Sequence, residues 1–175
     1  MPMLHCQCLW CNSSQRWAER TIFILSKKGT THLIDTFSEL EIIEFGKKYA
    51  PEIYHTDPEA ALETYYRGLI ASGWHLTAIW MRMMVDYMEH FARGVQDGRR
   101  NGAGLGLQDL EWYQPVRPGH TLTYTYEIIE KSEKVVRDKW GIIKSRNEAF
   151  NQYNEPVMSF TIDILAERNP ELLSA

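Results

Sequence analysis

The feature that most constrains the fold is a long segment, residues 70–91, which reads as a helix with apolar side chains on nearly every side of its first half. Leucine, isoleucine, tryptophan, methionine and valine recur there at helical spacing with few charges between them. A helix of this composition in a soluble protein has to be buried on most of its faces. The segment therefore predicts a central helix enclosed by other elements. Its methionines could form an adaptable binding groove, but filling the core is the simpler interpretation.

After this helix, the hydrophobic pattern changes to the period of a strand. Apolar and polar residues alternate over 110–113, 122–128 and 158–165, with turn signals at Pro118-Gly119 and Asn154-Glu155. Such alternation is typical of antiparallel strands with one buried face. Helices first and hairpin strands later predict an α+β fold, a single domain in which an antiparallel sheet wraps around the long central helix.

The segment before the helix predicts smaller elements. Two short strands are expected at 21–25 and 30–34, and a helix at 39–49. Ser38 and Glu41 have the spacing of a capping box at the start of that helix.

Loops are expected where the periodicity is lost. One covers residues 50–57, and the other covers residues 94–106, which contain several glycines and arginines. Asp57 precedes a proline and a short helical turn, so we expect it to cap that turn rather than to act in catalysis.

The length of 175 residues predicts one domain. Residues 1–20 read as an extension that contains cysteines and has no periodicity, residues 21–168 as the domain, and residues 169–175 as a C-terminal tail.

The extension places His5 beside Cys6, Cys8 and Cys11. These four side chains could bind a metal ion, since thiolates and imidazole are zinc ligands. They lie in one short stretch, however, and no second pair of ligands follows. A tail of reduced thiols is the simpler interpretation, and no metal site is expected.

Charge and hydropathy exclude some classes of protein. The net charge is -4, the isoelectric point is about 5.9 and no basic block appears, so nucleic-acid binding gains no support. The longest charge-free apolar run near the central helix, residues 68–81, falls short of the roughly 18 residues that a membrane span requires. The first residues lack the features of a secretory signal. We therefore expect a cytoplasmic or organelle-matrix protein.

Residues 49–75 carry the candidate site. His55 stands just before a DPEAA turn, and the small residues Ala71, Ser72 and Gly73 lie at the start of the central helix. The free N–H groups at a helix N-terminus can hold a developing oxyanion, and an imidazole can transfer a proton near neutral pH. Together they predict acid–base chemistry on a carbonyl compound.

Four strings in this order resemble the MaoC-like dehydratase family of the hot-dog fold, over about residues 40–168. They are YAPEIYHTDPEAA (49–61), GLIASGWH (68–75), GLGLQDLEWYQPVRPGHTLTYTYEIIEK (104–131) and NEAFNQYNEPVMSFTIDIL (147–165). Their shared order and spacing carry the resemblance.

The resemblance implies R-specific hydration of a trans-2-enoyl thioester or the reverse dehydration. The family pairs an Asp and a His in the pattern D-x-N-P-x-H and binds the thioester carbonyl at the N-terminus of the central helix. The family histidine then corresponds to His55, and the oxyanion donor to the N–H of Gly73. The resemblance also implies a homodimer and no metal or redox cofactor. Coenzyme A or an acyl carrier is then part of the substrate.

The chain departs from that pattern. Ala50 stands where the family has its Asp, Glu52 replaces the Asn, and Ile53 replaces the Pro. The favoured assignment gives proton transfer to His55 and the role of second acid or base to Glu52, whose longer side chain can reach across the offset. Ala71, Ser72, Tyr54 and Trp74 are expected at the substrate. The last two read equally well as core residues.

Other interpretations stay open. The chain can bind a thioester without hydrating it, as a non-catalytic or dimer-partner subunit. His55 can also be a structural loop histidine, and a hot-dog thioesterase is a further alternative. We expect His75 to be a hydrogen-bonded core histidine.

Overall fold

The computed structural model describes residues 22–25, 30–90, 101–136 and 140–167. The predictions for the extension with its cysteines, for residues 94–100 and for the C-terminal tail lie outside these ranges. The elements run in the order β1 (Ile22–Leu25), β2 (Thr30–Thr36), α2 (Glu39–Tyr49), α3 (Ile53–Thr56), η1 (Ala60–Glu63), α4 (Gly73–His90), β3 (Asn101–Trp112), β4 (Thr121–Val136), β5 (Trp140–Phe150) and β6 (Pro156–Glu167).

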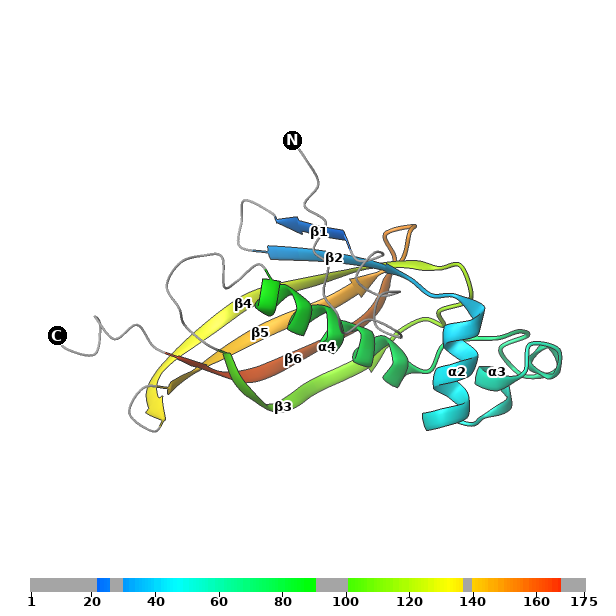
Figure 1. Ribbon diagram of the computed structural model, residues 1–175, viewed down its shortest axis with the longest axis horizontal. Coiled ribbons are helices and arrows are strands. Elements are labelled where there is room, and N and C mark those ends of the chain that lie inside the picture. Colours follow the sequence, from blue (N-terminus) through cyan, green and yellow to red (C-terminus); the bar gives the residue numbers. More distant parts are fainter. Residues whose placement is uncertain (1–21, 26–29, 91–100, 137–139, 168–175) are drawn as a thin grey trace, which may run out of the picture.

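The strands form one antiparallel sheet in the order β1-β2-β4-β5-β6-β3. Helix α4 lies across one face of this sheet, and α2 and α3 lie together beyond one end of it (Figure 1). The predicted α+β architecture, with a sheet around a central helix, is confirmed.

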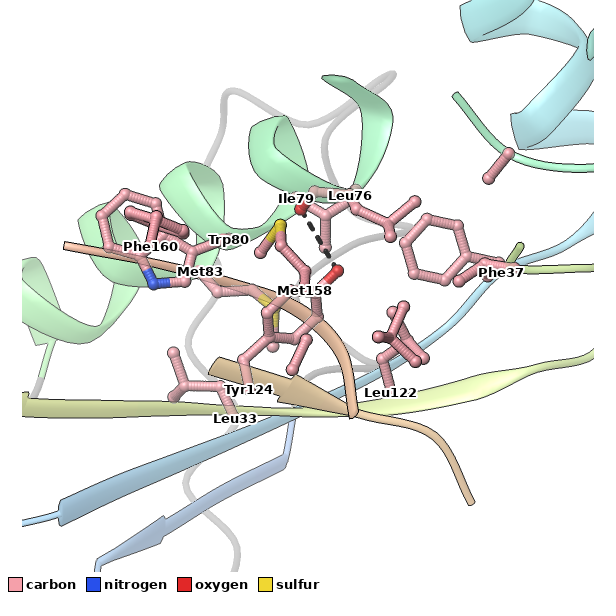
Figure 2. Close-up of a cluster of buried hydrophobic side chains, with 14 of the residues drawn as sticks. Leu33, Phe37, Leu76, Ile79, Trp80, Met83, Leu122, Tyr124, Met158 and Phe160 are labelled. Carbon is pink, nitrogen blue, oxygen red and sulfur yellow. Dashed lines mark hydrogen bonds between the residues drawn. The ribbon is translucent and has the colours of Figure 1, made fainter. Parts of the chain in front are cut away.

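The core lies between α4 and the sheet. Leu76, Trp80 and Met83 of α4 pack against Tyr124 and Phe160 from the strands (Figure 2). The Trp80 indole N–H donates to the Asn147 side-chain oxygen at 3.1 Å, and the Tyr124 hydroxyl donates to the Leu76 carbonyl at 3.2 Å. These hydrogen bonds offset the cost of removing the polar groups from water and fix the helix on the sheet.

The composition of helix α4 predicted burial on most of its faces, but one apolar face is exposed. Met83 and Met84 are buried, which supports their role as core filler, but Trp74, Met81 and Val85 are exposed on another face. The helix therefore leaves an apolar face uncovered by the described part of the chain.

Helix α2 has the predicted bounds. The Ser38 hydroxyl accepts from the Glu41 N–H at 3.3 Å, and the Glu41 carboxylate accepts from the Ser38 N–H at 3.0 Å. This reciprocal pair is the predicted capping box.

Two predicted loops were wrong in part. Helix α3 occupies residues 53–56 within the first, because a single turn is too short to show a helical period. Strand β3 begins at residue 101, within the second predicted loop. The glycines that suggested a loop are tolerated because β3 is an edge strand with bulges, which produce register shifts along its pairing to β6. Helix α4 begins at Gly73 rather than at residue 70.

Candidate active site

Helix α3 holds His55 against the segment that leads into α4. The His55 side chain is buried, with its Nδ1 2.8 Å from the Ile70 carbonyl oxygen. The Ile70 N–H in turn donates to the Tyr54 carbonyl at 2.9 Å. These two hydrogen bonds fix the imidazole beside Ile70, which is three residues before Gly73.

The partner of Nδ1 defines the tautomer of His55. A carbonyl oxygen only accepts hydrogen bonds, so Nδ1 must carry the hydrogen. The neutral ring then has its lone pair on Nε2. This nitrogen can accept a proton, as a general base requires.

Helix α2 packs against the main chain of His55. A Cβ atom added to Gly46 would lie only 2.5 Å from the His55 main-chain oxygen. Glycine at this position therefore allows the backbones of α2 and α3 to approach closely. The approach restricts the main chain that carries the imidazole.

Gly73 is the first residue of α4, as the assignment of an oxyanion donor requires. Among the described residues, its N–H has no backbone acceptor, because an α-helix leaves its first N–H groups unpaired. The helix dipole adds partial positive charge at the same end. The Gly73 N–H can therefore donate to an oxygen that becomes negative during a reaction.

The two residues before Gly73 are buried and held in place. The Ala71 N–H donates to the Val116 carbonyl at 2.7 Å, and the Ser72 carbonyl accepts from the His75 N–H at 2.9 Å. Both residues position the first turn of α4 through their backbone.

Two tryptophans flank the start of α4. Trp74 is 58% exposed, and its ring meets that of Trp112 edge to face at 5.2 Å. A Cβ atom on Gly73 would lie 2.5 Å from the Trp112 ring, so the indole packs directly on the glycine. Trp74 is thus no core residue. Sequence reasoning did not include Trp112 in the site, because its contact with Gly73 joins two distant segments.

Tyr54 lies partly buried beside His55. Its ring contacts the His55 ring at 4.5 Å and the Tyr66 ring at 5.0 Å. Burial is the main cause that raises the pKa of the Tyr54 hydroxyl, and the nearby Glu52 carboxylate adds to it. Tyr54 therefore stays protonated and forms an aromatic wall next to the imidazole.

The acidic residues take different positions. Glu52 is the N-cap residue of α3, and its exposed side chain makes no capping hydrogen bond. Asp57 accepts from the N–H groups of Glu59 and Ala60, both at 3.0 Å, which confirms its predicted capping role. Ala50 ends α2 and is buried.

His75 is a core residue, as expected, but its hydrogen bonding differs from the prediction. Its ring stacks on Phe45 with 4.4 Å between ring centroids, and its Nδ1 has no hydrogen-bond partner within the described residues. Burial, the largest cause, lowers its pKa to about 4, so the ring is neutral at pH 7.

The described ranges hold no group of three His, Cys, Asp or Glu side chains arranged to bind a metal ion. They also contain no helix with the length and apolar character needed to cross a membrane.

A sheet wrapped around α4, with a histidine beside the N-terminus of that helix, defines a hot-dog fold with a candidate acid–base site. The profile of the MaoC like domain matches residues 35–146. The chain belongs to the MaoC-like dehydratase family.

Three similar proteins illustrate this membership. The chain is 27% identical over 131 residues to the uncharacterized protein YdeM of Bacillus subtilis, covering 75% of this chain and 86% of YdeM. A crystal structure of a MaoC-like dehydratase from Rhodospirillum rubrum is 28% identical, with a TM-score of 0.69, over 85% of this chain and 99% of that one. An R-hydratase from Pseudomonas aeruginosa is 21% identical, with a TM-score of 0.60, over 87% of this chain and 85% of that one, and supports the fold alone.

Proposed function

We propose that this protein is a hydratase or dehydratase for acyl thioesters, adding water across the double bond of a trans-2-enoyl thioester of coenzyme A or an acyl carrier. One observation carries the proposal. The hydrogen bond from His55 Nδ1 to the Ile70 carbonyl leaves a lone pair on Nε2. The same hydrogen bond holds this base on α3 against Ile70, three residues before the N–H of Gly73, which has no backbone acceptor among the described residues.

In the proposed reaction, the thioester carbonyl accepts a hydrogen bond from the Gly73 N–H. Water gives one proton to His55 Nε2 while its oxygen bonds to Cβ, and the carbonyl takes up enolate charge. A proton then returns to Cα, and the product is the 3-hydroxyacyl thioester. Two groups can deliver this proton to Cα. Glu52 is the candidate, and the alternative is His55, which has just taken a proton from the water.

Hydration involves no net oxidation or reduction, so the proposal includes no redox cofactor, and it assigns no step to a metal ion. The coenzyme A or carrier portion belongs to the substrate. Ala71, Ser72, Tyr54 and Trp74 are proposed to surround the acyl group, with Trp112 added by its contact with Gly73. The cytoplasmic or organelle-matrix location stays a prediction.

The test follows crotonyl-CoA by loss of enoyl absorbance and, in parallel, by release of free thiol. We expect hydration without thiol release, and a loss of about 100-fold or more in kcat for His55→Ala, the usual range for a general acid–base group. His32→Ala, a substitution on β2, is the matched control and should keep full activity. Equal activity of His55→Ala and wild type would refute the assignment.

A second candidate is a non-catalytic thioester-binding or dimer-partner subunit, which Ala50 favours because no acid stands at that position. It predicts measurable binding of crotonyl-CoA without turnover. Free thiol in the same assay would instead indicate the third candidate, a hot-dog thioesterase.

We also propose a homodimer. Strand β3 lies at an edge of the sheet and exposes Leu105 and Leu107, while α4 exposes Met81 and Val85. The Trp74–Trp112 contact joins these two apolar surfaces. We propose that a second copy of the chain covers these surfaces, because the family resemblance implies a homodimer.

A further inference from the structure

His75 occupies a fixed position in the first turn of α4, two residues after Gly73. Its side chain is only 3% exposed. The ring lies parallel to that of Phe45, with 7° between the planes, and meets the edge of Phe37 at 5.1 Å. Aromatic contacts on two sides restrict the ring to one plane.

The buried Nδ1 atom of His75 has no hydrogen-bond partner in the described part of the chain. A buried polar atom left unpaired costs about 1–3 kcal/mol, and native proteins keep few of them. A phenylalanine would fit the same aromatic surroundings without this cost. The histidine therefore requires a reason other than packing.

His75 and His55 are close enough to influence each other electrostatically. Burial is the main cause that lowers the pKa of His75, Glu41 opposes it, and His55 lowers the pKa further. Helix α2 contacts both residues, since the Phe45 ring stacks on the His75 ring while the adjacent Gly46 packs against the His55 main chain. Ala50, which lacks the family carboxylate, ends this same helix.

We propose that His75 is a third polar group of the acyl-thioester site, whose Nδ1 binds the oxygen atom that is added at Cβ. This inference rests on the proposed function. The attacking water has two O–H groups. One gives its proton to His55 Nε2, and the other donates a hydrogen bond to His75 Nδ1, so that an oxygen lone pair faces Cβ. The hydroxyl of the product then keeps its hydrogen bond to Nδ1.

A neutral imidazole suits this role. It accepts a hydrogen bond without taking the proton that His55 must receive, because a base with a pKa of about 4 stays unprotonated at neutral pH. It also gives the water a polar partner in a chain that has alanine at position 50.

The test compares two stable ligands, 3-hydroxybutyryl-CoA and butyryl-CoA, which lacks the hydroxyl. For His75→Phe we expect the Kd of 3-hydroxybutyryl-CoA to rise about tenfold and that of butyryl-CoA to stay within about twofold, as loss of one hydrogen bond implies. The kcat for crotonyl-CoA should fall at least tenfold, while the melting temperature stays equal or rises. His75→Gln, which keeps an acceptor, should recover part of both losses.

Tyr126→Phe is the matched control. It removes a buried hydroxyl on β4 that faces Tyr87, near the other end of α4, and should leave both affinities unchanged. If His75→Phe does not fold, the ring nitrogens of His75 in the wild-type protein are followed by NMR. Their signals should shift on adding 3-hydroxybutyryl-CoA and not on adding butyryl-CoA.

The outcomes separate the two proposals. Wild-type kcat and affinities in His75→Phe, or ring signals that respond equally to both ligands, would overturn the role of His75 and leave the proposed function standing. Selective loss of 3-hydroxybutyryl-CoA binding without any turnover of crotonyl-CoA would support His75 and reject the hydratase. Failure of the wild type to bind either ligand would reject both.

Discussion

At position 50 a methyl group occupies the place of the family acid, at the end of α2 and close in sequence to His55. Ala50→Asp restores the carboxylate. If the native site is impaired there, kcat for crotonyl-CoA should rise at least tenfold, within the usual contribution of a general acid or base. A carboxylate at a buried helix C-terminus opposes the helix dipole, so we expect the variant to lose about 1 kcal/mol of stability.

Ala50→Asn is the control, because it adds a side chain of similar size that cannot transfer a proton. An equal gain in both variants would attribute the effect to polarity rather than to acid–base chemistry. No gain in Ala50→Asp would mean that another group already fills the role.

The sequence was a good guide to residues whose roles depend on their neighbours in the chain. Asp57 caps the turn that follows it, and the small residues up to Gly73 mark the start of the central helix to within three residues of the predicted one. It was a poor guide to roles that depend on distant segments. The unpaired Nδ1 of His75 and the contact between Trp112 and Gly73 arise only when α2 and β3 pack against α4.

At the scale of elements, the start of α4 depends on its contact with β3. A Cβ atom on Gly73 would overlap the Trp112 ring, so Gly73→Ala must displace the indole or the helix. We expect a loss of about 1–3 kcal/mol in the free energy of unfolding, the usual cost of overpacking, measured by urea denaturation. The kcat for crotonyl-CoA should also fall, because the N–H at the helix start moves.

Two comparisons isolate this contact. In a Trp112→Ala background, Gly73→Ala should cost much less, because the ring that it strikes is absent. Gly104→Ala should cost less than Gly73→Ala in the wild type, since its new methyl meets only the flexible tip of Ile162, at 3.2 Å. Equal costs of Gly73→Ala with and without Trp112 would contradict the packing argument.

Elements with a clear period or cap were predictable, and the others were not. Helix α2 was predicted to its bounds because a capping box and an apolar stripe agree. Helix α3, which carries His55, is a single turn held by tertiary hydrogen bonds to Ile70. Strand β3 was read partly as a loop, since glycines and bulges hide its alternation.

At the scale of the whole molecule, the uncovered apolar surface predicts association. The proposed homodimer should sediment at twice the 20.5 kDa of one chain. Leu105→Lys places a charge on the β3 edge and should shift the protein towards monomer, because the charge would be desolvated in the interface. Leu62→Lys, at an exposed leucine in η1, is the control and should leave the dimer intact. A wild-type monomer would reject the proposal.

Global stability should also report the burial of His75. Burial lowers its pKa from 6.5 to about 4, so between these pH values the unfolded chain binds a proton that the folded chain does not. The free energy of unfolding should therefore fall as the pH drops through this window, by roughly 3 kcal/mol in total. His120, whose pKa is lowered mainly by burial, acts in the same direction.

The difference between wild type and His75→Phe isolates this contribution, because the carboxylates and the other histidines titrate in both proteins. Urea denaturation at a series of pH values from 4 to 8 should show the variant gaining stability relative to wild type as the pH falls, with little change in the difference above pH 7. A constant difference across the series would mean that folding does not lower the pKa of His75, so that the folded protein would carry a charged ring towards pH 4. A charged His75 could not accept a hydrogen bond at Nδ1. This measurement therefore tests, without any substrate, whether burial keeps the ring neutral as its proposed role requires.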